Sequence, residues 1–229
     1  MTRISALLLL AITTPVWASD NLSINFEVTA DVAACTPTLS NNGTVDFGSR
    51  SVNSLAKTTF TQLGTRELTL TINCESSTAV AITSRDTRTS SVRAGEDAQG
   101  GVGPLFTDRY VANATGQFGL GFTAENKPIG SYAVQINAAG VTASDGEQNV
   151  SVDMAGAESK DGPWVISDYP TLRTTEDFYL TFVKKGTAVV QPVSSAVVPL
   201  RISAAVANGL NSSQKIILDG EAVISLVYL

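Results

Sequence analysis

Apolar and polar residues alternate along several short segments of this chain, and this period of two constrains the fold more than any other feature. The clearest run, Leu68 to Cys74, places Leu68, Leu70, Ile72 and Cys74 on one face of an extended segment. The same pattern predicts strands at Val80 to Ile82, Gln117 to Thr123, Tyr132 to Ile136, Phe178 to Val183, Val197 to Val206 and Ala222 to Leu229. About eight to ten short strands separated by turns are typical of a β-sandwich, so the sequence predicts an all-β fold.

Turn and loop residues separate these segments. Asn42-Gly43, Asn208-Gly209 and Asp219-Gly220 are pairs suited to positive φ. Two stretches rich in glycine and acidic residues, Arg93 to Gly103 and Asp153 to Gly162, are predicted to be mobile loops. Both fall in or near a long middle region, residues 85–162, for which the sequence offers no role.

The first eighteen residues have the pattern of a secretory signal. Arg3 supplies the positive charge, Leu7 to Ile12 form an apolar run too short to span a bilayer, and Val16-Trp17-Ala18 fits a cleavage site before Ser19. We therefore expect an exported chain with a signal peptide (1–18), an N-terminal extension (19–34) and one β-domain (35–229).

The chain has two cysteines, Cys35 and Cys74. Export would bring both into an oxidising compartment, where they are expected to pair. A disulfide that closes a loop of this size stabilises a fold by roughly 4 kcal/mol on chain-entropy grounds. The alternatives are two buried thiols or a catalytic cysteine, but the chain has no histidine to activate a thiolate.

Composition argues against catalysis and against nucleic-acid binding. With no histidine, the usual Ser-His-Asp, Cys-His and His-based metal sites are excluded. The net charge of −6 disfavours a nucleic-acid partner. Gly119 to Ala124 matches a dinucleotide fingerprint in letters, but it lies in a strand-like segment rather than between a strand and a helix. We expect no enzyme activity, no cofactor and no metal.

Three features together resemble the chaperone–usher pilins, the subunits of bacterial fimbriae. Before the first cysteine, a segment alternates in the manner of that family's donor strand, with Leu22, Ile24, Phe26 and Val28 on one face. Cys35-Thr36-Pro37 and Ile72-Asn73-Cys74 are similar to the family's two bridged cysteine positions, and Val45-Asp46-Phe47-Gly48 resembles its step after the first cysteine.

The third feature is the C-terminus, which resembles the strand that the family's chaperone recognises. It alternates up to a penultimate tyrosine, through Ala222, Ile224, Leu226 and Tyr228. The chain departs from the family where a glycine is usual, because Ile216 stands there and Gly220 lies closer to the end. In the long middle region, Phe118-Gly119-Leu120-Gly121 and Ile129-Gly130-Ser131-Tyr132 look like a less-characterised fimbrial-type branch.

The resemblance implies an incomplete immunoglobulin-like β-sandwich that lacks its last strand. It also implies a structural pilus subunit, exported through the periplasm to the cell surface and assembled by donor-strand exchange. Its partners would be a periplasmic pilus chaperone, an outer-membrane usher and neighbouring pilin subunits.

Other functions stay open at this stage. The chain could be a receptor-binding tip or minor subunit that acts in cell adhesion through a host receptor, or a self-contained secreted β-sandwich that never polymerises. Residues 19–34 could likewise form an ordinary first strand in the chain's own sheet.

Overall fold

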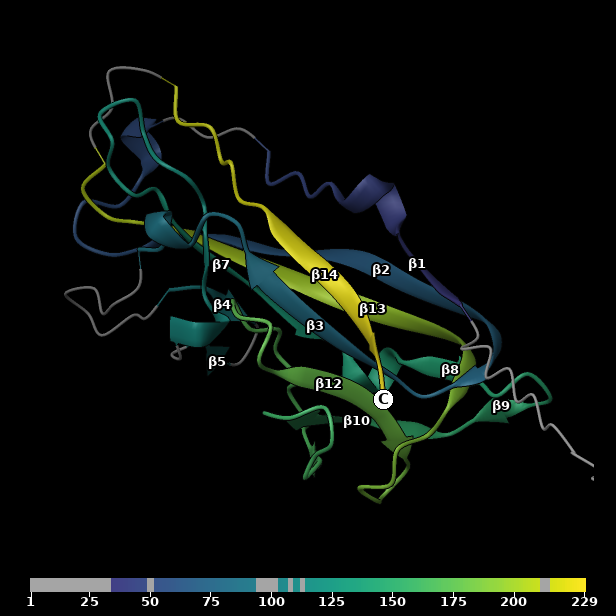
Figure 1. Cartoon of the computed structure of the whole chain (residues 1–229). Helices are drawn as coiled ribbons and strands as arrows, with labels where there is room; N and C mark the ends of the chain where they lie inside the picture. The colour runs from purple at the N-terminus through teal and green to yellow at the C-terminus, as the bar shows by residue number, and fades with distance from the viewer. Residues whose placement is uncertain (1–33, 49–51, 94–102, 107–108, 112–113, 211–214) are drawn as a thin grey trace, which may run out of the picture. The chain divides into compact units, whose positions relative to one another are not determined.

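Two large antiparallel β-sheets and one small two-stranded sheet make up the fold, which confirms the all-β prediction (Figure 1). A computed structural model describes residues 34–48, 52–93, 103–106, 109–111, 114–210 and 215–229. Within these ranges there is no α-helix, and the strands are β1 (Cys35–Leu39), β2 (Thr61–Thr78), β3 (Val80–Asp86), β4 (Leu105–Phe106), β5 (Arg109–Tyr110), β6 (Phe118–Gly119), β7 (Gly130–Ile136), β8 (Thr142–Ser144), β9 (Asn149–Val150), β10 (Val152–Ala157), β11 (Val165–Ile166), β12 (Tyr179–Lys184), β13 (Val193–Val206) and β14 (Ala222–Tyr228). Short 3-10 turns lie between them: η1 (Ser40–Gly43), η2 (Val52–Ser54), η3 (Thr89–Ser91), η4 (Ala114–Gly116) and η5 (Ala138–Gly140).

The first sheet has the order β1-β2-β13-β7-β6, and β8 and β9 extend it beside β13. The second has the order β11-β10-β12-β3-β14. The long strand β2 pairs with β13 from Thr61 to Thr78, with a register shift near Gly64, whose φ is +83°. A glycine suits this position because an extra residue in an antiparallel pair often needs a left-handed backbone. The C-terminal strand β14 lies at one edge of the second sheet, and among the described strands it pairs with β3 alone.

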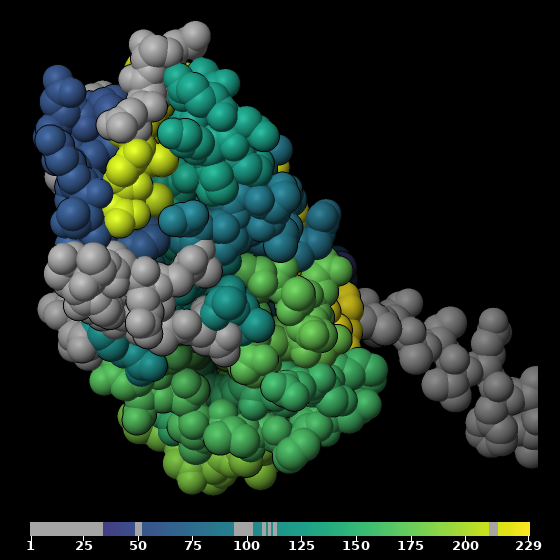
Figure 2. Space-filling model, turned by 90° about the vertical axis from the view of Figure 1, so that its left-hand side faces the viewer, coloured from purple at the N-terminus to yellow at the C-terminus, as the bar shows by residue number. Residues whose placement is uncertain are grey.

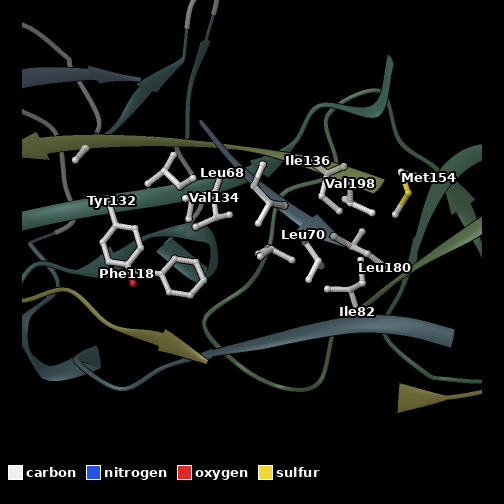
Figure 3. Packing of buried hydrophobic residues seen from close by; sticks show 14 of the residues in the cluster. Leu68, Leu70, Ile82, Phe118, Tyr132, Val134, Ile136, Met154, Leu180 and Val198 are labelled. Atoms are coloured by element: carbon white, nitrogen blue, oxygen red, sulfur yellow. The ribbon is translucent and has the colours of Figure 1, made fainter. Parts of the chain in front are cut away.

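Side chains from the inner faces of both sheets form one core (Figure 3). Leu70 from β2 and Val198 from β13 meet Ile82 from β3 and Leu180 from β12, and all four are almost completely buried. The predicted face of β2 is confirmed, because Leu68, Leu70 and Ile72 have exposed fractions of 9%, 1% and 0%. Alternation in the sequence therefore identified the side of this strand that faces the core.

Part of the long middle region covers the outer face of the first sheet. The hydroxyl of Ser203 on β13 donates a hydrogen bond to the main-chain oxygen of Leu105 on β4, at 2.7 Å. The side chain of Gln62 donates to Gly103 and accepts from Leu105. Phe106 is fully buried as a result. These contacts cover part of the outer face of β2 and β13. The neighbouring strand β7 is buried along its whole length.

Two predictions for the middle of the chain were wrong. Residues 153–162 are not a mobile loop throughout, because β10 runs through Ala157 and buries Met154 and Ala155 against the core. The strand predicted from Gln117 to Thr123 stops at Gly119, since Gly121 adopts a φ of +86° and leaves Phe122 42% exposed. Most of the other predicted loop, residues 93–103, lies outside the described residues.

No helix in the described part of the chain is long and apolar enough to cross a membrane. The predicted signal peptide (1–18) and the donor-strand residues Leu22, Ile24, Phe26 and Val28 lie outside the described residues.

Candidate strand-accepting groove

A disulfide fastens the outermost strand of the first sheet. Cys35 on β1 and Cys74 on β2 are directly opposite in the strand register, and their sulfur atoms are bonded at 2.05 Å. The predicted pairing is therefore confirmed. A disulfide of this kind persists in an oxidising compartment and not in the reducing cytoplasm, so it supports an exported protein.

The C-terminal strand β14 presents one unpaired edge. Thr87 N–H donates to Glu221 O and Leu229 N–H donates to Ala79 O, which fixes the hydrogen-bonded positions between β14 and β3. In an antiparallel pair these positions alternate. The main-chain groups of Ala222, Ile224 and Leu226 therefore point away from β3, toward an edge with which no strand of the described chain pairs.

Between this edge and β1 lies a groove of about 710 Å³, here called the open-edge groove. One wall runs from Leu39 along residues 43–48 to Leu55, and the other runs from Lys215 to Ile224. Figure 2 shows yellow residues from the C-terminal part of the chain between blue residues that follow β1 and teal residues of the middle. The floor consists mainly of apolar side chains from β2, β7 and β13: Leu63, Leu68, Tyr132, Val134, Leu200, Ile202 and Val206.

The floor of the groove is continuous with the core. The ring of Tyr132 packs against that of Phe118, with ring centroids 5.2 Å apart, and Phe118 is fully buried (Figure 3). Burial raises the pKa of the Tyr132 hydroxyl far above its usual value, and the nearby carboxylates of Asp86 and Glu221 raise it further. The hydroxyl therefore stays protonated and neutral at any physiological pH.

The segment that leads into β14 is held in place by residues from distant parts of the chain. Arg88 forms an ion pair with Asp219 at 2.9 Å, and Asp219 N–H donates to Leu120 O. Gly220 lies against the groove floor, where a Cβ atom would come within 2.6 Å of Tyr132 Cε1. The prediction that Gly220 adopts a positive φ was wrong. A glycine is required there because the main chain lies so close to the ring of Tyr132 that no side chain fits.

Sequence reasoning missed Asp86, which lies at the end of β3 and is 7% exposed. Its carboxylate accepts hydrogen bonds from the main-chain N–H groups of Gly119 and Arg88, both at 2.8 Å. Burial raises the pKa of this carboxyl, while these hydrogen bonds and the Arg88 charge oppose the shift. Asp86 thus ties the middle region to the sheet that carries β14. Among the described residues, no cluster of His, Cys, Asp or Glu side chains could hold a metal ion.

The structure places the four predicted C-terminal strand residues on β14. Ala222, Ile224 and Leu226 are partly buried and pack against the core. Tyr228 is 41% exposed, and its hydroxyl accepts a hydrogen bond from Cys35 N–H at 2.9 Å. The structure therefore brings the predicted C-terminal strand next to the disulfide-bonded strand β1, beyond one end of the groove.

These features define a class: a disulfide-bonded β-sandwich whose first and last described strands flank an open apolar groove. A family model described as "protein of unknown function (DUF1120)" matches residues 26–133. The chain is 47% identical over 220 residues to "uncharacterized protein YhcF" of Escherichia coli (strain K12), a match that covers 93% of this chain and 92% of that protein. It is 30% identical over 215 residues to "protein GltF" of the same organism, covering 86% and 84%. The chain therefore belongs to the same protein family as YhcF and GltF. No solved structure matches it.

Proposed function

We propose that this chain is a structural subunit of a bacterial surface fimbria or pilus, and that a strand from a neighbouring subunit completes its sandwich. The observation that carries the proposal is the open-edge groove, with its apolar floor and the unpaired edge of β14. In this interpretation the domain is an immunoglobulin-like sandwich without its last strand, and the groove is the place that this strand would occupy.

An unfilled groove of this kind is unfavourable for an isolated subunit. Its floor is lined by core side chains such as Leu68 and Val134, which border the groove although little of each is exposed, and the β14 edge offers main-chain groups to any extended chain. An added strand satisfies both, because its main chain pairs with the edge while alternate side chains enter the groove. The proposed periplasmic chaperone and outer-membrane usher would protect the groove until a neighbouring subunit fills it.

The occupant that we infer is the N-terminal extension, residues 19–34, of a second subunit. Its face of Leu22, Ile24, Phe26 and Val28 is apolar, as is the groove floor. A seven-residue strand spans about 20 Å. Burial of four such side chains contributes on the order of 6–12 kcal/mol before ordering costs are subtracted. Donation from one subunit to the next does not close on itself, so it produces fibres.

Assembly of the mature chain, residues 19–229, tests the proposal. Replacing Phe26→Asp puts a charge on the apolar face of the extension and should abolish polymers, measured by electron microscopy and by SDS-resistant ladders. Asn25→Asp adds the same charge to the opposite face and serves as the matched control, so it should polymerise normally. Unchanged polymers from Phe26→Asp would show that the extension is not the donor.

Co-expression with a periplasmic pilus chaperone separates the remaining alternatives. We expect a stable 1:1 complex on gel filtration that is lost in Ile224→Asp but kept in Ser225→Asp, whose side chain lies on the other face of β14. A well-behaved free monomer that needs no chaperone and never polymerises would instead identify a self-contained secreted β-sandwich. A subunit that binds the chaperone and caps polymers without extending them would be a tip or minor subunit, for which a host receptor could then be sought.

A further inference from the structure

The two ends of the open-edge groove differ. At the end beside the disulfide, Tyr228 reaches from β14 to β1 and accepts a hydrogen bond from Cys35 N–H at 2.9 Å. The groove lining begins farther in, at Leu39 on one wall and Ile224 on the other. Tyr228 therefore connects the two edge strands at a point beyond the end of the groove.

The outer edge of β1 also offers few donors at this end. Glu75 N–H donates to Ala34 O, so the alternation of an antiparallel pair turns the main-chain groups of Cys35, Pro37 and Leu39 away from β2. The N–H of Cys35 is already bonded to Tyr228. Pro37 has no N–H, which is typical of prolines on edge strands. The first outward N–H of β1 that remains for an added strand is that of Leu39.

We propose that Tyr228 and Pro37 close the disulfide end of the groove and act as a stop that sets the register of the added strand. This inference rests on the proposed function and adds the position of the donor within the groove. A strand with period-two alternation can slide by two residues without changing which face is buried. A closed end removes this freedom, so that the extension of a second subunit lies between Leu39 and Ile224 at one end and Val52 and Ile216 at the other.

Photo-cross-linking of a donor peptide tests the stop. The acceptor is the mature chain with Phe26→Asp, which should accept a strand but not donate one, purified free or in a chaperone complex that the peptide displaces. The donor is a synthetic peptide of residues 19–33 with photo-leucine at position 22 or at position 28, and cross-linked sites are mapped by mass spectrometry. The peptide with Phe26→Asp controls for non-specific labelling.

We expect cross-links on the groove walls, residues 39–48 and 216–224, and none on residues 35–37 or 226–229. A second acceptor also carries Tyr228→Phe, which loses only the hydroxyl. In this acceptor, the cross-links from one of the two photo-leucine positions, 22 or 28, should extend to residues 35–37. Cross-links at residues 35–37 in the acceptor that keeps Tyr228, or identical maps for the two acceptors, would overturn the stop. Labelling that does not differ between the donor and its Phe26→Asp control would instead refute the proposed function.

Amide hydrogen exchange tests the hydrogen bond between Cys35 and Tyr228 directly, in the absence of a donor peptide. In Tyr228→Phe we expect the Cys35 amide to exchange about tenfold faster, the effect of losing one hydrogen bond. The amide of Thr36, which points toward β2, is the internal control and should not change. An unchanged Cys35 exchange rate would show that the tyrosine does not hold this end of the groove.

Discussion

Two hollows in the described part of the sandwich are of nearly equal size, and they differ in how the two sheets meet there. The open-edge groove is about 710 Å³, and a second hollow, between the β8–β9 hairpin and β10, is about 730 Å³. At the second hollow the chain passes directly from β9 to β10 through Ser151, whose carbonyl accepts a hydrogen bond from Lys185 N–H at 3.2 Å. At the open-edge groove, no described strand joins β14 to β1.

The comparison shows that volume alone does not distinguish the groove proposed to accept a strand from the second hollow. Both hollows have charged side chains among their lining residues: Asp153, Asp168 and Lys185 in the second hollow, and Asp46, Lys215 and Glu221 in the open-edge groove. The open-edge groove has a floor of core side chains and an unpaired strand edge. An extended segment gains from both of these features, because it can bury apolar side chains and pair its main chain at the same time.

The largest effect is expected from removing the disulfide that holds the β1 wall. The double variant Cys35→Ser/Cys74→Ser should lose roughly 4 kcal/mol of unfolding free energy, measured by urea denaturation, because the unfolded chain is no longer cross-linked. Donor-peptide binding should weaken as well, since β1 is anchored only through β2. Reduced wild-type protein is the control and should behave like the variant. A loss below about 1 kcal/mol would mean that β1 is held by its ladder alone.

Substitutions of two leucines on β2 distinguish the contribution of the core from that of the groove. Leu70 is fully enclosed, whereas Leu68 lies on the groove floor. We expect Leu70→Ala to cost about 3 kcal/mol with or without the donor peptide, because it leaves a cavity. Leu68→Ala should cost less in the free subunit and more in the complex, where the added strand would cover it. Urea denaturation with and without the peptide measures both, and equal behaviour of the two variants would contradict a fillable groove.

A smaller effect is expected at Asp86, which anchors the middle region near the groove. Asp86→Ala leaves the N–H groups of Gly119 and Arg88 without their acceptor and should cost about 1–3 kcal/mol. Because burial raises its pKa in the fold, Asp86 favours folding most at pH values below its unfolded pKa, and this contribution is lost as pH rises through the folded pKa. Asp86→Asn should therefore gain stability relative to wild type as pH rises from acid, and a constant difference across pH would contradict the raised pKa.

A feature of this fold could be predicted from the sequence when it depends on neighbouring residues, and not when it depends on contacts between distant segments. Alternation in Leu68 to Cys74 and in Ala222 to Tyr228 reports which face of a strand is buried, so these strands, the core face of β2 and the disulfide could be predicted. The role of Asp86 could not be predicted, because an acidic residue at the end of a strand gives no sign that a distant main-chain group, the N–H of Gly119, will donate a hydrogen bond to it.

The residues that form the walls of the groove could not be predicted from the sequence either. Gly220 was predicted as a turn residue because its pair with Asp219 has turn chemistry, and only the fold shows that Tyr132 requires a glycine there. The groove itself arises because β1 and β14, at opposite ends of the described chain, become edges of different sheets. That arrangement depends on pairings between distant segments, which no local pattern encodes.

The smallest effect is expected beside the second hollow, in the turn between β8 and β9. The carboxylate of Asp145, which is partly exposed, accepts hydrogen bonds from the main-chain N–H groups of Gln148 and Glu147, at 2.9 and 3.0 Å. These bonds lower its pKa, so the turn is stabilised above the unfolded pKa of 3.8 and loses this support as pH falls through the lower, folded value. A carbon-detected NMR titration of the Asp145 carboxyl should show a midpoint below 3.8, and exchange at the Gln148 amide should accelerate only in acid. Asp145→Asn should remove the pH dependence of that amide while leaving donor-peptide binding at the open-edge groove unchanged. If the substitution weakened donor binding, the two hollows would be coupled, and the open-edge groove could no longer be treated as an independent site.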